Sequence, residues 1–281
     1  MLLNEGLLSL LPVLSLSNRC YLALYSSCRT ISRSIIKTTL QTLVDYTPDD
    51  PSVDQEKLTN CMNLAGLVQG ANEVASAMLR CFCTVTAQQY SAQFIEHVFN
   101  ASELEGVSRT TCELVRDLVT CIRDCNDVVC DTATPLQQPA VFVFTQFTRV
   151  KPAGEEGEMM DYIEKAITSR LRVLPVEMKP VMRDVLGGVV KLFAKEVGEV
   201  IRANVCYDYQ LRALVSNMGL LMTMVGEMVK DDSDVKELVN EVVMSCYERC
   251  YEPTVVEEEE QKMMIESGIE LYKDVITVEE Y

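Results

Sequence analysis

The apolar residues of this chain recur at steps of three and four positions over several long stretches. The clearest series are Leu114, Val115, Leu118, Val119, Ile122 and Cys125; Met182, Val185, Leu186, Val189, Val190, Phe193, Val197 and Ile201; Leu211, Leu214, Val215, Met218, Leu221, Met222, Val225 and Val229; and Val235, Leu238, Val239, Val242, Val243 and Cys246. This spacing places the apolar side chains on one face of an α-helix. Because such faces need neighbours to cover them, we predict an all-α protein of stacked antiparallel helical bundles with at least seven helices.

Helix start signals precede several of these series. A serine, threonine or aspartate followed three residues later by glutamate or glutamine predicts a helix start, because the two side chains satisfy free backbone amides. Such pairs are Ser52 with Gln55, Thr110 with Glu113, Asp234 with Glu237, and Thr254 with Glu257.

Residues 131–158 interrupt the helical pattern. Proline and glycine residues surround an apolar run at 140–148, which fits either a short strand or a deeply packed helix. These breakers predict a boundary between two helical subdomains. We therefore expect an N-terminal helical subdomain at 1–134, a connection at 135–157, and a C-terminal bundle with an acidic tail at 158–281.

Charge narrows the choice of partners. The 281 residues include 42 acidic and 25 basic side chains, which gives a net charge of −17. A protein of this charge repels polyanions, so we predict that it does not bind nucleic acid. The leucine-rich run at 7–16 has no basic residue before it and is interrupted by Pro12, so it fits neither a signal peptide nor a membrane span.

Twelve cysteines accompany a single histidine, His97. Several cysteines stand four or five residues apart, which is a helical spacing and not the two-residue gap of zinc sites. These are Cys121, Cys125 and Cys130, and then Cys246 and Cys250. We therefore expect buried, unbridged thiols and no bound metal. His97 lies beside an apolar stretch without a group to orient it for catalysis.

Sequence motifs of catalysis are not visible in the chain. It has no phosphate-binding loop, dinucleotide fingerprint, serine nucleophile elbow, zinc-protease helix or kinase signature. We predict a protein without catalytic residues, cofactor or small-molecule substrate. An enzyme that uses cysteine chemistry is a further hypothesis, which one unusually reactive thiol would favour.

The segments 207–218 and 231–253 carry a family resemblance. Their apolar, glutamate and Arg-Cys positions resemble the C-terminal helix pair of multisubunit vesicle-tethering proteins, such as subunits of the exocyst and of the Golgi-associated retrograde protein complex. The resemblance implies rods of stacked helical bundles that bind other subunits. It covers about 50 of the 281 residues. The long N-terminal coiled coil through which those subunits assemble is not visible in this sequence.

These observations favour a non-enzymatic helical scaffold whose partners are other protein subunits. The resemblance implies a cytoplasmic protein that reaches a Golgi, endosomal or plasma membrane only peripherally, through those partners. The alternative is a structural subunit of an unrelated organellar or viral complex, and the basic, serine-containing stretch between Arg19 and Lys37 would fit a mitochondrial location. We expect the helix at 235–251 to pack against the helix that begins near Tyr207, with Glu241, Arg249 and Glu252 facing a partner.

Overall fold

A computed structural model describes residues 18–46, 64–100, 106–125, 141–144, 173–175, 178–229 and 232–276. These residues form eight α-helices, one π-helical turn and one short parallel strand pair, which confirms the predicted all-α fold and the expected number of helices. The elements are α2 (Asn18–Tyr46), α4 (Leu64–Phe94), η1 (Ile95–Phe99), α5 (Arg109–Arg123), α7 (Met182–Ala203), β1 (Cys206–Tyr207), α8 (Asp208–Val225), α9 (Ser233–Arg249), β2 (Cys250–Tyr251), α10 (Glu258–Leu271) and α11 (Lys273–Ile276).

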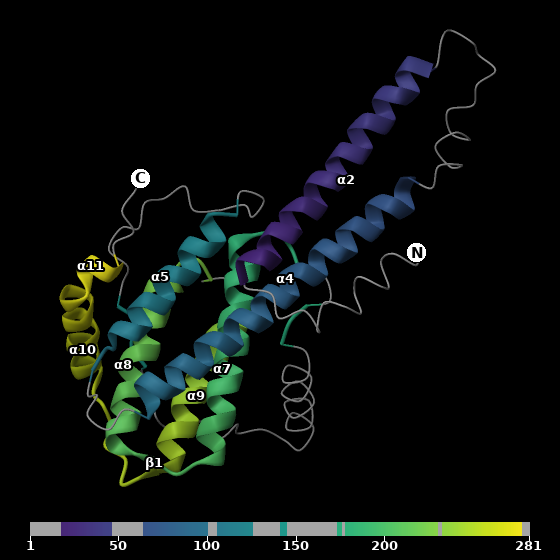
Figure 1. Ribbon diagram of the computed structural model, residues 1–281. Coiled ribbons are helices and arrows are strands. Elements are labelled where there is room, and N and C mark those ends of the chain that lie inside the picture. Colours follow the sequence, from purple (N-terminus) through teal and green to yellow (C-terminus); the bar gives the residue numbers. More distant parts are fainter. Residues whose placement is uncertain are drawn as a thin grey trace.

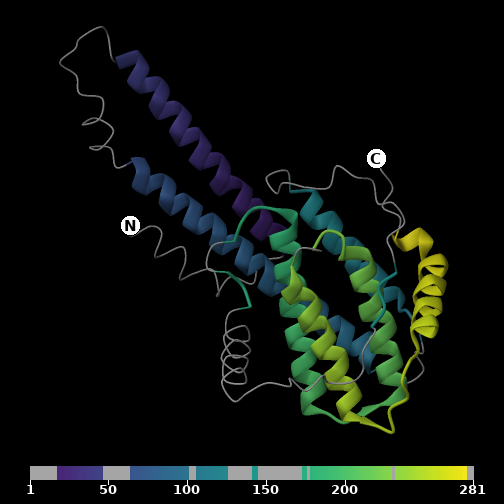
Figure 2. The same ribbon diagram turned by 180° about the vertical axis from the view of Figure 1, so that it is seen from behind.

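The helices form a body from which one long hairpin projects. Helices α2 and α4 lie side by side and antiparallel, and only the C-terminal part of α4 enters the body, as both views show (Figures 1 and 2). Within the body, α7, α8 and α9 run up and down beside one another, and α10 and α11 cover the outer side. No helix in the described ranges combines the length and apolar character that crossing a bilayer demands.

A single main core joins helices from both sides of residues 135–157. Phe82 of α4, Ile122 of α5, Leu186 of α7, Leu214 of α8 and Val239 of α9 are all buried in one cluster. The apolar series read from the sequence supply most of this core, because each series lies on the face that its helix turns inward. The division into two subdomains stays a prediction, and most of the connection at 135–157 lies outside the described residues.

The predicted start of α5 is wrong by two residues. The N-cap is Ser108, whose hydroxyl accepts a hydrogen bond from the amide of Thr110 at 3.2 Å. Glu113 does not cap the helix, because its carboxylate pairs with Arg109 at 2.8 Å. The buried amide of Asn217 fixes Ser108 by accepting its backbone N–H at 2.8 Å. A tertiary contact, which the local pattern does not reveal, therefore sets this helix start.

The starts of α9 and α10 also differ from the prediction. Asp234 lies in the first turn of α9, and both it and Asp232 pair with Lys191 of α7 at 3.6 and 2.8 Å. Thr254 lies four residues before α10, and its backbone N–H donates to Asp208 at 2.8 Å. Lys191 therefore binds the carboxylate predicted to cap α9, and Asp208 holds the backbone at the residue predicted to cap α10. The start predicted at Ser52 lies outside the described residues.

The apolar run at 140–148 is neither strand nor helix where the structure describes it, at 141–144. Side chains of two helices hold its backbone in place of a partner strand. The amide of Phe142 donates to the Thr223 hydroxyl of α8 at 3.0 Å. The side chain of Gln261 on α10 accepts from the Phe144 N–H at 2.8 Å and donates to the Phe144 carbonyl at 3.0 Å. Backbone groups that enter an interior need such partners.

Candidate functional site

The most distinctive surface lies where two helix connections meet at one end of the body. The α7–α8 connection contains β1 and the α9–α10 connection contains β2, and the two strands pair in parallel with Cys206 opposite Cys250 and Tyr207 opposite Tyr251. We call this end, residues 204–209 and 249–256, the β tip (lower end of Figure 1). Both strands have the sequence Cys-Tyr.

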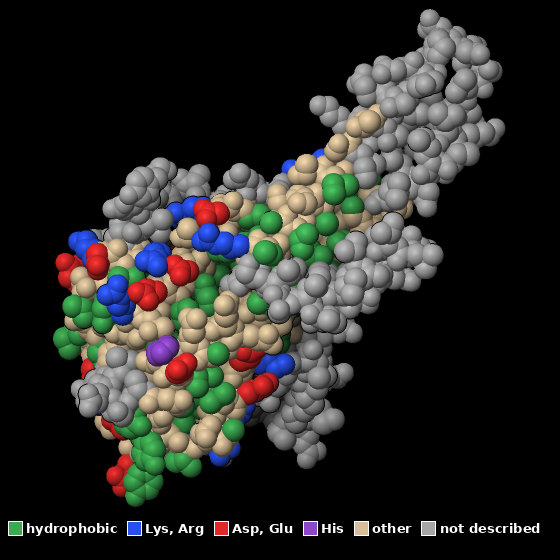
Figure 3. Space-filling view, in the orientation of Figure 1, with side chains coloured by type: hydrophobic (Ala, Val, Ile, Leu, Met, Phe, Trp, Pro, Cys, Tyr) green, Lys and Arg blue, Asp and Glu red, His purple; other side chains and the backbone are tan. Residues whose placement is uncertain are grey.

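The outer side of the β tip exposes large apolar side chains. Val205, Tyr207 and Tyr251 are 64%, 53% and 66% exposed, and Val255 is also exposed. The ring of Tyr209 stacks on that of Tyr207, with centroids 6.0 Å apart. Figure 3 shows hydrophobic side chains gathered at this end with acidic groups beside them. Contiguous exposed apolar patches with a polar rim are typical of protein interaction sites, where tyrosine is enriched.

Ion pairs behind the β tip fix the positions of its two connections. Arg212 of α8 pairs with Asp208 at 2.9 Å and also with Glu260 of α10. Asp208 accepts the Thr254 N–H as well, so one carboxylate ties the start of α8 to the segment after β2. Partial burial raises the pKa of Asp208, but the hydrogen bonds from Thr254 and Arg212 outweigh it and lower the pKa below its usual range.

Three thiols converge beneath the exposed side. Cys206 and Cys246 are fully buried, and Cys250 is partly exposed. The hydrogen bond from Cys246 lowers the pKa of Cys206; burial opposes this, and the Arg249 guanidinium adds to it. The same hydrogen bond, together with burial, raises the pKa of Cys246, which stays a donor. Burial, with the Asp208 and Cys206 charges, raises the pKa of Cys250 to about 11.

Other buried cysteines behave differently from Cys206. Burial raises the pKa of Cys83 and raises that of Cys112 to about 11. The Cys83 thiol donates to the Val185 carbonyl at 3.5 Å, as a small core residue does. All ten cysteines in the described ranges are free thiols. Among the same residues, no group of three or more histidine, cysteine, aspartate and glutamate side chains is arranged to hold a metal ion.

The three residues predicted to face a partner do not lie together. Arg249 ends α9 and Glu252 follows β2, so both belong to the β tip and both are exposed. Neither makes an ion pair with another described residue. Glu241 lies two turns earlier on α9, where Arg202 of α7 pairs with it at 3.8 Å. Helix α9 contacts α8, as expected, but its main neighbour is α7.

Sequence reasoning missed the tyrosines and the converging thiols. The spacing of Cys246 and Cys250 was visible, but the approach of Cys206 depends on the pairing of β1 with β2. The tyrosines at 207 and 251 were the available signal, because tyrosine is enriched in strands. The Cys-Tyr dipeptide is not specific, because it also occurs inside α2 and α9.

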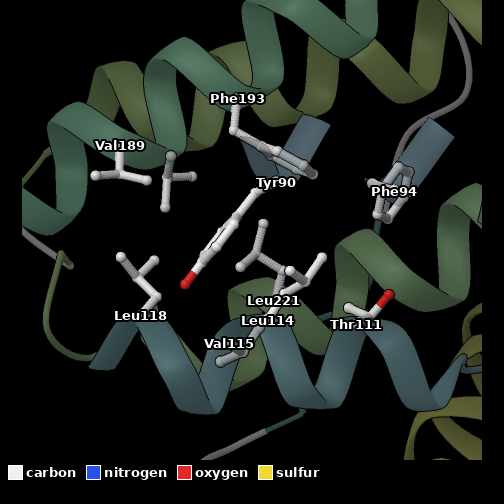
Figure 4. A pocket seen from close by; sticks show the side chains of 10 residues that line it. Tyr90, Phe94, Thr111, Leu114, Val115, Leu118, Val189, Phe193 and Leu221 are labelled. Carbon is white, nitrogen blue, oxygen red and sulfur yellow. The ribbon is translucent and has the colours of Figure 1, made fainter. Parts of the chain in front are cut away.

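A cavity inside the body offers little room for a ligand. It lies between α4, α5, α7 and α8, and the ring of Tyr90 occupies its middle between Phe193 and Leu118 (Figure 4). Its volume of about 20 Å³ suits about one water molecule, whereas pockets for small molecules span hundreds of Å³. Thr111 adds one buried hydroxyl that has no hydrogen-bond partner among the described residues. His97 lies on η1 and is exposed, and its Nε2 is 3.9 Å from a carboxylate oxygen of Glu96.

Comparison with known protein families, with curated proteins and with solved structures gives no match for this chain. The resemblance to vesicle-tethering subunits therefore rests on the sequence segments 207–218 and 231–253 alone.

Proposed function

We propose that this protein is a non-enzymatic helical subunit of a larger assembly, and that it binds a neighbouring subunit through the β tip. The observation that carries the proposal is the exposure of Val205, Tyr207 and Tyr251 on one surface. Burying the apolar surface that these side chains leave in water would contribute about 25 cal/mol for each Å² removed from solvent. A partner surface would supply that burial.

The β tip is also preorganised, which favours binding. The strand pair and the Asp208–Arg212–Glu260 ion pairs hold its backbone from two sides. Tyrosine side chains lose little conformational freedom on binding, because two dihedral angles define them. Arg249 and Glu252 lie at the rim, where a partner of complementary charge would pair with them, which fixes orientation more than affinity.

Vesicle tethering is the assembly type that we favour. The sequence segments that resemble tethering subunits, 207–218 and 231–253, contain Tyr207 of β1, the first part of α8, and all of α9 and β2. In this proposal the protein is cytoplasmic and reaches a Golgi, endosomal or plasma membrane through the other subunits.

The test is affinity purification of the full chain, followed by mass spectrometry, with two matched double variants. Tyr207→Ser with Tyr251→Ser removes the rings of the β tip. Met263→Ser with Leu271→Ser removes two side chains of similar exposure, 62% and 68%, from α10. We expect the first variant to lose the partners of the unmodified protein and the second to retain them. Equal recovery by both variants would contradict binding through the β tip.

The identity of the recovered proteins tests the rest of the proposal. Recovery of other tethering subunits, lost with the tyrosine variant, supports the vesicle-tethering assembly. Recovery of mitochondrial proteins or of capsid proteins would instead support the alternative of an organellar or viral complex.

A further inference from the structure

We propose that Cys206 and Cys250 form a reversible disulfide across the β1–β2 pair, by exchange with a small-molecule disulfide such as oxidised glutathione. Cys246 assists by hydrogen bonding to Cys206. This inference goes beyond the proposed scaffold function and does not depend on it, because it requires these thiols and no protein partner.

The strand pairing places the two cysteines within bridging distance. Cys206 and Cys250 are opposite each other in the parallel register, and neighbouring strands lie about 4.8 Å apart. Disulfides join residues whose Cα atoms are about 4.4–6.8 Å apart. Side chains at facing positions of adjacent strands point to the same side of the sheet. The strand register therefore brings the two Cα atoms into the range of a disulfide, with both side chains on the same side of the strand pair.

Cysteines four residues apart on a helix do not share this geometry. Their Cβ atoms are about 5–6 Å apart, whereas a disulfide needs about 3.5–4.5 Å. Cys121 lies in the last turn of α5 and Cys125 directly follows its C-cap, so they have this spacing without facing each other across a strand pair, and they include one partly exposed and one buried thiol. They therefore provide a matched control pair for Cys206 and Cys250.

Forming this bond by exchange takes two steps, attack of one cysteine on the small disulfide and then attack of the other cysteine on the mixed disulfide. The exposure of the two cysteines indicates which reacts first. The Cys206 side chain has no exposed surface, so a small disulfide in solution meets the partly exposed Cys250 first. Within the cluster, Cys206 is the thiol whose ionised form is stabilised, by the Cys246 S–H and the Arg249 guanidinium. Thiolates are the attacking species in disulfide exchange, so Cys206 is suited to the second step.

The exchange conserves atoms and electrons. The Cys250 thiolate attacks one sulfur of oxidised glutathione, which gives a Cys250–glutathione mixed disulfide and one glutathione thiolate that takes up the proton lost from Cys250. The Cys206 thiolate then attacks the Cys250 sulfur, the bond from Cys250 to glutathione breaks, and a second reduced glutathione leaves with the proton lost from Cys206. Two protein thiols are oxidised by two electrons, and one glutathione disulfide is reduced to two thiols. Excess reduced glutathione reverses both steps.

The experiment incubates the full chain with oxidised glutathione at pH 8.5, blocks remaining thiols by alkylation and maps disulfides by mass spectrometry. We expect a Cys206–Cys250 linked peptide that disappears on adding reduced glutathione. Absence of that bridge, or equal bridging of Cys121 with Cys125, would overturn the proposal. Because this result comes from the unmodified protein, it does not depend on whether a variant folds.

Variants then test the order of the steps. Cys206→Ser should accumulate the Cys250–glutathione mixed disulfide, and Cys121→Ser should form the bridge as the unmodified protein does. Cys246→Ala removes the S–H that stabilises the Cys206 thiolate, so it should slow closure of the bridge. The assigned order would be contradicted if glutathione attached to Cys206 in the Cys250→Ser variant as fast as it attaches to Cys250 in the unmodified protein.

Discussion

Helix α8 passes through two contrasting regions of this molecule. At its start, Tyr207 and Tyr209 stack against each other at the β tip, and Tyr207 is half exposed. In its middle, all but two of the residues from 210 to 225 are buried, although they include polar side chains. The core thus accepts polar groups, while the surface carries apolar ones.

The contrast separates two roles that hydrophobicity alone would confuse. The buried amide of Gln210 donates to the carbonyl of Phe99 at the end of η1, and that of Asn217 binds backbone groups of the irregular segment 106–108. These polar side chains stabilise the fold because every group has a partner. The tyrosines of the β tip lack such a structural reason for their exposure. Substitutions in the middle of α8 should therefore change stability, and those at the β tip should change binding.

The largest expected effect is on stability, from Leu214→Ala in the middle of α8. Leu214 is fully buried in the main core, so its truncation removes buried apolar surface and leaves a cavity. We expect a loss of about 2–5 kcal/mol in the free energy of unfolding, measured by urea denaturation. Leu238→Ala on α9 is the matched comparison, because Leu238 is only partly buried and its loss should be smaller. Equal losses at the two positions would show that their difference in burial does not govern stability.

The second prediction concerns the polar interior. Asn217→Ala removes a side chain that accepts the Ser108 N–H at 2.8 Å and donates to the Gly106 carbonyl at 2.9 Å. The Ser108 amide is then left buried without a partner, which costs about 1–3 kcal/mol. In the variant, backbone amides at 106–110 should exchange hydrogen faster than those in the remainder of α5. Uniform acceleration over the whole chain would show instead that Asn217 has no local role.

The helical architecture was predictable because it depends on local periodicity. The buried faces of α5 and α7 follow the apolar series directly, since three- and four-residue steps identify one helix face. Helix α8 contains its series but is buried on nearly all sides, including polar residues outside the series. Helix starts were less predictable. Lys191 forms ion pairs with Asp232 and Asp234, and Asp208 accepts the Thr254 backbone N–H. Because these contacts join residues 41 to 46 positions apart, the local sequence does not reveal them.

The candidate site was predictable only in part. Arg249 and Glu252 do lie at the β tip, because Arg249 ends α9 and Glu252 follows β2 where the chain leaves the body. Glu241 does not, because a helix rises 1.5 Å per residue and eight residues separate it from Arg249. The approach of Cys206 to Cys250 requires the pairing of two connections that lie over 40 residues apart, which no local pattern encodes.

The smallest expected effect on stability comes from Asp208→Asn, which tests whether the charge of Asp208 helps to hold the β tip. Hydrogen bonds from Thr254 and Arg212 lower the pKa of Asp208 in the folded protein despite its partial burial. Its contribution to the free energy of unfolding is therefore present above the unfolded-state pKa of about 3.9, and it is lost as the pH falls through the lower pKa of the folded state. Asn keeps the shape and one acceptor oxygen but cannot ionise. Because Asp208 is partly exposed to solvent, we expect the variant to lose less than about 1 kcal/mol at pH 7. At pH 3 the difference between the two proteins should shrink, since both side chains approach a neutral form. Urea denaturation at the two pH values measures it, and a loss of the same size at pH 3 would assign the effect of Asp208 to packing and hydrogen bonding without its charge.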